Sequence, residues 1–145
     1  ELTLGTGLTM TGTVLSSAGG SMMKVWGSEG GALGNNQTVY AYFTGAPAIT
    51  ATESLSQVRM PACTIRALSG NNSVHGTDYT ITVRKNGAGT AMTTGLVSSI
   101  ANHFRVTTGA PLTFADGDLL ALQIVMATGG PGSTFRGLYL EVKLT

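Results

Sequence analysis

The sequence has few of the residues on which metal sites and disulfides depend. It contains one cysteine and two histidines. The single cysteine, Cys63, excludes an intrachain disulfide and the multi-cysteine patterns of zinc sites. We expect Cys63 to be a small core residue of a strand, because free cysteine is commonly buried. His75 and His103 lie too far apart for zinc-ligand spacing, and both are expected in exposed loops or at an interface, where copies of one histidine from neighbouring subunits remain able to hold an ion.

Charge is also scarce. Charged residues make up 10% of the chain, against about 25% in typical soluble proteins, whereas 42% of residues are hydrophobic. A monomer has few charges with which to coat its surface, so we expect an oligomer. The net charge is +1 without any block of like charges, which predicts no nucleic-acid or anionic-lipid partner. The longest apolar run, residues 119–126, is far shorter than the ~18 residues of a membrane helix.

No set of residues points to catalysis. The seven carboxylates are scattered, no Gly-x-Ser-x-Gly motif precedes a helix, and no glycine-rich phosphate loop is present. Asp116 and Asp118 flank a glycine, but two carboxylates do not supply the roughly six to eight oxygens that calcium needs, so a turn is expected there. We therefore expect neither an enzyme nor a cofactor, although a glycosidase carboxylate pair stays open.

Glycine, in contrast, is abundant, and it separates short strand patterns. It accounts for 21 of 145 residues, about twice its usual share of roughly 7%. The clearest strand is residues 79–85, followed by Asn86 and Gly87, which tolerate the positive φ angles of a type I′ turn and predict a return strand over residues 88–94. One face, expected in the core, holds Tyr79, Ile81 and Val83, and the other, facing solvent or a neighbouring subunit, holds Thr80, Thr82 and Arg84.

Other strands are expected at residues 22–26, 38–44, 57–60, 62–68, 119–126 and 136–144, and a strand pair with a turn near Ala101 and Asn102 is expected over residues 96–106. Residues 119–126 are apolar on both faces, which predicts a central, covered strand. Loops are expected at residues 27–37 and 69–78. No segment longer than about ten residues shows a helical repeat. The pattern predicts an all-β, antiparallel sandwich or barrel.

The front of the chain has its own pattern. Apolar residues occupy even positions among threonine and glycine, at Leu2, Leu4, Leu8, Met10 and Val14. Residues 1–17 resemble the shaft or neck segments of bacteriophage tail fibres, which implies three chains wound together; an edge strand of the main domain is the alternative. Gly19 and Gly20 are the expected joint between a shaft at residues 1–20 and a head domain at residues 21–145. The start at Glu1 suggests a fragment or a processed product.

Three stretches follow one another along the chain, residues 60–68, residues 80–87 and residues 114–122. Together with the closing strand, they resemble the jelly-roll head domain of the C1q and tumour-necrosis-factor superfamily, of which small, glycine-rich versions occur in phage and bacterial fibres. The resemblance implies a homotrimer of ten-stranded sandwiches around a three-fold axis. The chain lacks a collagen-like leader and has few aromatic residues, so a complement role is not supported.

The expected function is therefore a non-enzymatic, trimeric fibre head on the virion surface that binds a host receptor, most simply a polysaccharide. A capsid-decorating protein that stabilises the shell is the alternative, and a polysaccharide-degrading enzyme is a third. Trp26, Tyr40 and Tyr42 are candidates for stacking on sugars, with the core or trimer interface as their alternative place. Arg84 and Lys85, beside the hairpin tip, are candidates for contact with an anionic surface, unless they are simply solvated.

Overall fold

The computed structural model describes residues 8–11, 14–17, 21–26, 33–43, 49–75, 77–95, 103–128 and 133–145. Within them the only helical element is a 3₁₀ turn, η1 (Glu53–Leu55), and all strand pairs are antiparallel. The predicted all-β, antiparallel class is confirmed. Among these residues, no helix has the length and apolar character needed to cross a bilayer.

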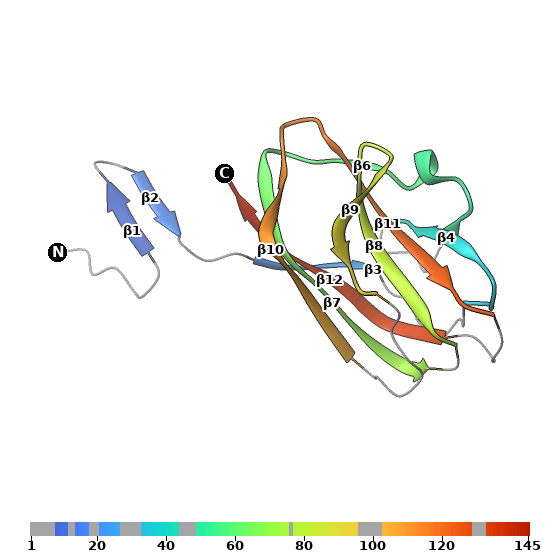
Figure 1. Ribbon diagram of the computed structural model, residues 1–145. Helices are drawn as coiled ribbons and strands as arrows, with labels where there is room; N and C mark the ends of the chain where they lie inside the picture. The colour runs from blue at the N-terminus through green and yellow to red at the C-terminus, as the bar shows by residue number, and fades with distance from the viewer. Residues whose placement is uncertain are drawn as a thin grey trace.

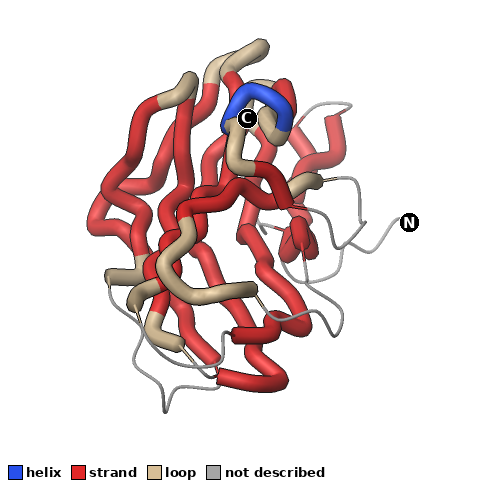
Figure 2. The backbone as a smooth tube through the Cα atoms, turned by 90° about the vertical axis from the view of Figure 1, so that its right-hand side faces the viewer, coloured by secondary structure: helices blue, strands red, loops and turns tan. Residues whose placement is uncertain are grey.

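The strands are, in chain order, β1 (Leu8–Thr11), β2 (Val14–Ser17), β3 (Ser21–Trp26), β4 (Thr38–Ala41), β5 (Ile49–Thr50), β6 (Val58–Arg59), β7 (Cys63–His75), β8 (Tyr79–Lys85), β9 (Ala88–Thr93), β10 (His103–Phe114), β11 (Leu119–Met126) and β12 (Ser133–Leu144). Sheet 1 has the order β10-β7-β12-β3. Sheet 2 has the order β5-β4-β11-β8-β9, with β6 also paired to β11. Figures 1 and 2 show these two layers of strands from perpendicular directions.

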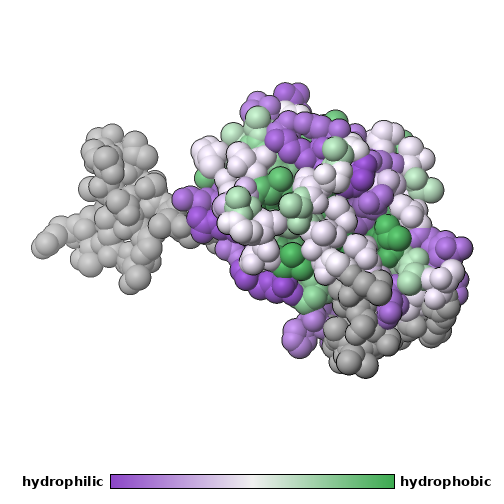
Figure 3. Space-filling view, viewed as in Figure 1, coloured by the Kyte–Doolittle hydropathy of each residue, from purple (hydrophilic) through white to green (hydrophobic). Residues whose placement is uncertain are grey.

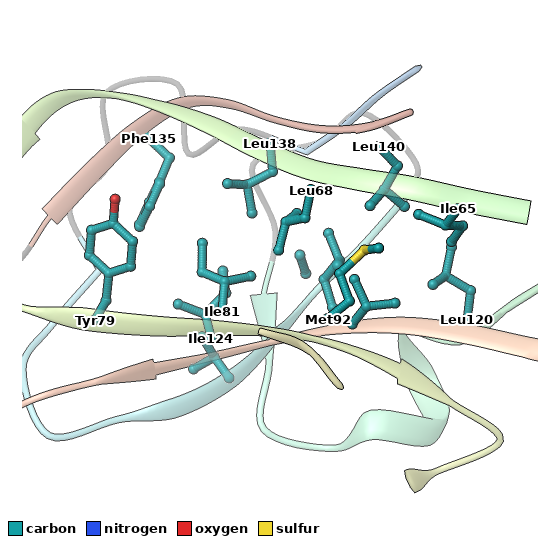
Figure 4. Close-up of a cluster of buried hydrophobic side chains, with 14 of the residues drawn as sticks. Ile65, Leu68, Tyr79, Ile81, Met92, Leu120, Ile124, Phe135, Leu138 and Leu140 are labelled. Carbon is teal, nitrogen blue, oxygen red and sulfur yellow. The ribbon is translucent and has the colours of Figure 1, made fainter. Parts of the chain in front are cut away.

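One apolar core fills the space between the layers. Ile65, Leu68, Phe135, Leu138 and Leu140 come from sheet 1 and point toward Tyr79, Ile81, Met92, Leu120 and Ile124 of sheet 2 (Figure 4). Tyr79, Ile81 and Val83 have no exposed surface, which confirms their predicted face. Cys63 is buried in the same core, as predicted.

The hairpin between β8 and β9 turns as the sequence predicts. Asn86 has φ of 51° and Gly87 has φ of 80°, both in the left-handed region that a type I′ turn requires. The backbone N–H of Asn86 donates to the Leu119 carbonyl at 2.9 Å. The hairpin tip is thus fixed to the start of β11.

The expected loop at residues 69–78 is wrong, because β7 continues to His75. Its register with β12 runs from Cys63 opposite Leu144 to His75 opposite Ser133. Gly70 is buried inside this stretch, and a Cβ atom there would lie 2.4 Å from the Phe104 ring. Glycine at this position therefore makes room for an aromatic ring of β10 and does not mark a loop.

Other features of the strands also differ from the expectations. β4 ends at Ala41 and does not reach residue 44, and β10 runs through a bulge to Phe114. β11 is central in its sheet, as predicted, and its core face is covered, but its outer face is covered only in part, since Ala121 is 1% exposed there and Val125 is 39% exposed. Residues 27–32 and 96–102 lie outside the described residues.

β1 and β2 form a separate two-stranded sheet and belong to neither large sheet. The register pairs Met10 with Leu15 and Thr11 with Val14. The alternating run that the sequence predicts as a shaft is thus divided between two paired strands. Leu2 and Leu4 lie outside the described residues, and the trimeric shaft stays a prediction.

Candidate functional site

A row of polar side chains crosses the outer face of sheet 2. Directly opposed residues of antiparallel strands share a face, and the registers align one residue from each of five strands. From β5 to β9 these residues are Thr50, Tyr40, Gln123, Thr82 and Thr93. Their alternating neighbours, such as Ala41 and Ile124, enter the core. We call this surface the Tyr40 face.

The side chains of the Tyr40 face hold one another in place. Gln123 donates from Nε2 to the Tyr40 hydroxyl at 3.1 Å, and the hydroxyls of Thr82 and Thr93 lie 3.0 Å apart. The Arg84 guanidinium carbon lies 6.0 Å from the centre of the Tyr40 ring, within cation–π range. The face therefore presents its aromatic ring in a fixed setting.

Arg84 is positioned by η1. Its Nε donates to Glu53 Oε1 at 2.8 Å, and both side chains are less than a fifth exposed. This hydrogen bond raises the pKa of Arg84 further above its ordinary value, so the pair is a fixed, internally neutral charge pair. The Tyr40 face thus offers a ring, an amide, hydroxyls and a paired guanidinium, which are groups that hydrogen-bond to polyhydroxylated molecules.

The structure brings together only two of the five predicted receptor residues. Tyr40 and Arg84 meet on this face. Tyr42 follows the end of β4 and is half-buried, whereas Trp26 lies in β3 of sheet 1, opposite Leu138. Lys85 is held at the end of the two sheets by the Thr113 carbonyl, at 2.9 Å.

Sequence reasoning missed Glu53 and Gln123. Glu53 lies in a stretch of weak strand character, and only the fold of η1 against β8 makes it the partner of Arg84. Gln123 interrupts the apolar run of β11. That interruption was a usable signal, because a polar residue in a central strand has to find a partner or face outward.

Asp118 completes a second polar cluster, at the hairpin tip. Its carboxylate accepts from Lys85 Nζ at 2.8 Å, from Asn86 Nδ2 at 2.7 Å and from the Ala115 backbone N–H at 2.7 Å. These contacts, led by the hydrogen bond from Lys85, lower the pKa of Asp118 to about 2. The cluster ties the β8–β9 turn to the β10–β11 turn, which supports the predicted turn role of Asp118.

Acid is expected to remove this contribution to stability. The pKa of Asp118 is lower in the folded state than the ordinary value of about 3.9, so the stabilisation is complete above that value and is lost as the pH falls toward about 2. We expect the melting temperature of Asp118→Asn to lie below that of the wild type at neutral pH, with the gap closing in acid. Melting curves at a series of pH values measure it. Asp116→Asn, at an exposed position of the same turn, is the control, and a gap independent of pH would contradict the assignment.

The two histidines are far from this cluster in the chain. His103 begins β10 and is exposed, and its register partner is Asn71 of β7. His75 ends β7, in a strand and not in the predicted loop. Within the described part of the chain, no three residues among His, Cys, Asp and Glu gather as metal ligands.

No protein family, curated protein or solved structure matches this chain. Its function has to be inferred from the two sheets and their outer faces.

Proposed function

We propose that this chain is the non-enzymatic head of a trimeric virion fibre, and that it binds a host-surface polysaccharide through the Tyr40 face. The observation that carries the proposal is the fixed ring of Tyr40, flanked by Gln123 and by the Arg84–Glu53 pair. Aromatic rings with polar tips are suited to wet interfaces, and the surrounding donors and acceptors match hydroxyl groups.

The pairing of the strands supports a jelly roll. β8 pairs with β9, β7 with β10, β4 with β11 and β3 with β12. This nested pairing is what results when one long antiparallel hairpin, with its tip at Asn86 and Gly87, is wrapped into two sheets. Eight strands in two such sheets make up the jelly-roll arrangement. The nesting supports the resemblance to C1q-like heads.

The surface chemistry supports association of several copies. Only 10% of the residues are charged, and Leu55, Val125 and Leu144 are exposed large hydrophobic residues. Figure 3 shows hydrophobic side chains scattered among polar ones on the visible face. Burial of some of these side chains between copies would remove apolar surface from water, which favours association.

The test measures binding and assembly together. The purified chain should have the mass of a trimer by light scattering and should bind immobilised bacterial surface polysaccharides. Tyr40→Ala is expected to weaken that binding about tenfold or more, since truncation of a central aromatic anchor costs about 1–2 kcal/mol or more. Tyr40→Phe, which retains the ring, is the matched control.

A chain that binds no polysaccharide, or a Tyr40→Ala variant that binds as the wild type does, would overturn the assignment of this face. Release of reducing sugar during incubation would overturn its non-enzymatic part. Antibody labelling of the shell of intact particles, with none on fibres, would instead favour a capsid-decorating protein.

A further inference from the structure

The outer face of sheet 1 concentrates positive charge. On β7, β10 and β12, alternation and register place four basic residues on this face, Arg66, Arg105, Arg136 and Lys143. Glu141 is the one carboxylate on the same face among the described residues, so four positive charges stand against one negative, a surplus of three. The whole chain carries +1. Although the whole chain is nearly neutral, positive charge is therefore concentrated on the outer face of sheet 1.

A bulge in β7 presents Arg66. Ile65 pairs with Val142 of β12 and with Leu112 of β10, and Ala67 pairs with Glu141 and Thr107, so Arg66 between them has no register partner on either side. Such a bulge places its two residues on the same face of the sheet. Arg66 and Ala67 both face outward, and Arg66 has no ion-pair partner among the described residues.

A second bulge, in β12, presents Arg136. Phe135 pairs with Asn72 and Gly137 pairs with Asn71, and Arg136 is again skipped. Arg136 is exposed, in contrast to the buried Phe135 before it. Within the described residues it has no ion-pair partner either. Two bulges in adjacent strands thus project two guanidinium groups from one face.

Tyr139 lies flat on this face over a glycine. A Cβ atom on Gly137 would lie 2.7 Å from the Tyr139 hydroxyl oxygen and 2.8 Å from Cζ, so the phenol end of the ring covers the Gly137 backbone. Tyr139 is half-buried and lies between Leu138 and Leu140, which enter the core. With main chain behind it on one side, the ring is a platform of the kind on which sugars stack.

The third arginine of the face is fixed. Arg105 donates from Nη2 to Glu141 Oε2 at 2.8 Å, across β7. The β7 residue opposite Arg105 is Ser69, and the β7 residue opposite Glu141 is Ala67. Both are small, and Ala67 is fully buried although it faces outward. The pair thus spans the middle of the face and neutralises the one carboxylate, so that Arg66 and Arg136 are left for a ligand.

From this geometry we infer that the outer face of sheet 1 binds a carboxylate-bearing sugar chain. The ring of Tyr139 would stack on a sugar, and the guanidinium groups of Arg66 and Arg136 would pair with carboxylates, for which their planar forks are matched. The inference rests on the proposed function and extends it, because it assigns an acidic class of polysaccharide to a second face. A neutral ligand would leave the surplus charge unmatched, and a second copy of this face would repel it.

The test uses the full chain and polygalacturonate as the carboxylated probe, with dextran of similar length as the neutral one. Polygalacturonate should bind more tightly than dextran, and its binding should weaken as salt is added. The Arg66→Gln/Arg136→Gln variant is expected to lose about tenfold or more in affinity for polygalacturonate. Tyr139→Ala should lose binding as well, whereas Tyr139→Phe should keep it, because the ring is retained.

Arg59→Glu is the matched control, since Arg59 is exposed in β6 of sheet 2 and its replacement lowers the net charge by two, as the double variant does. Melting curves of every variant show whether its fold is retained. The inference is overturned if double-stranded DNA competes as well as polygalacturonate, if Arg59→Glu weakens binding as much as the double variant, or if the double variant changes the oligomeric mass and not the affinity. A chain that binds host polysaccharides but prefers dextran would reject this inference alone, whereas a chain that binds no polysaccharide would reject the proposed function too.

Discussion

Phe135→Ala is expected to lower the free energy of unfolding by about 3–5 kcal/mol, the usual range for loss of a buried phenylalanine. The Phe135 side chain has no exposed surface. Its ring packs edge-to-face on Tyr79, with centroids 4.8 Å apart and planes at 71°. Because the two rings come from different sheets, the cavity would lie between the layers, where neither sheet can close it alone.

Tyr79 cannot easily move to fill the cavity that Phe135→Ala would leave. Its hydroxyl accepts from Asn72 Nδ2 at 2.8 Å in the buried interior, and burial raises its pKa to about 12, so the hydroxyl stays protonated at neutral pH. A shift of Tyr79 into the cavity would stretch this hydrogen bond. Urea titration measures the change, and Leu55→Ala, at a side chain that is 63% exposed, is the control, expected within about 0.5 kcal/mol of the wild type. A loss below about 1 kcal/mol for Phe135→Ala would contradict this packing.

Gly70→Ala is expected to destabilise the chain by about 1–3 kcal/mol through overpacking. The new methyl group would lie 2.4 Å from Cε1 and Cζ of Phe104 and 2.9 Å from Cδ2 of Leu138. Phe104 is half-buried and can move outward only by giving up its edge-on contact with Tyr79, at 6.0 Å between ring centroids. The side chain of Leu138 is fully buried, so it has little room to yield.

A double-mutant cycle separates the clash from other causes. Phe104→Ala removes the ring that the new methyl group would meet, so Gly70→Ala should cost less in the Phe104→Ala background than in the wild type. The free energies of unfolding of the four proteins give the coupling directly. Equal costs in both backgrounds would show that the close approach of the ring to Gly70 is not what requires glycine there.

The β8–β9 hairpin and strand β7 show which parts of the fold could be predicted from the sequence and which could not. The β8–β9 hairpin was predictable because its signals are local: alternation in residues 79–85 and a turn pair with positive φ. The long reach of β7 was not, because Gly70, Asn71 and Asn72 resemble a loop when read alone. Their reasons are tertiary, since Gly70 admits the Phe104 ring and Asn72 donates to Tyr79.

The candidate sites follow the same division. Alternation was enough to place Arg84 on an outward face, but it left Tyr40 between a sugar-binding face and the core or trimer interface, and it did not show that Glu53 holds Arg84. On the other sheet, Arg66 and Arg136 lie at bulges, which shift the alternation by one residue and cannot be seen in a count of charges. The ring of Tyr139 rests on Gly137, and glycine alone predicts only a turn or a weak point in a strand.

The position of β12 in sheet 1 determines the order in which the strands can pair during synthesis. β12 is the last strand of the fold in sequence, yet it lies inside sheet 1, between β7 and β3. During synthesis β3 has no neighbour in its sheet until β12 leaves the ribosome, whereas β8 and β9 can pair at once. Sheets closed by such distant pairing form slowly, and their open edges are exposed to other chains while they wait. Until β12 has been synthesised, the edges of β3 and β7 therefore remain open to pairing with strands of other chains.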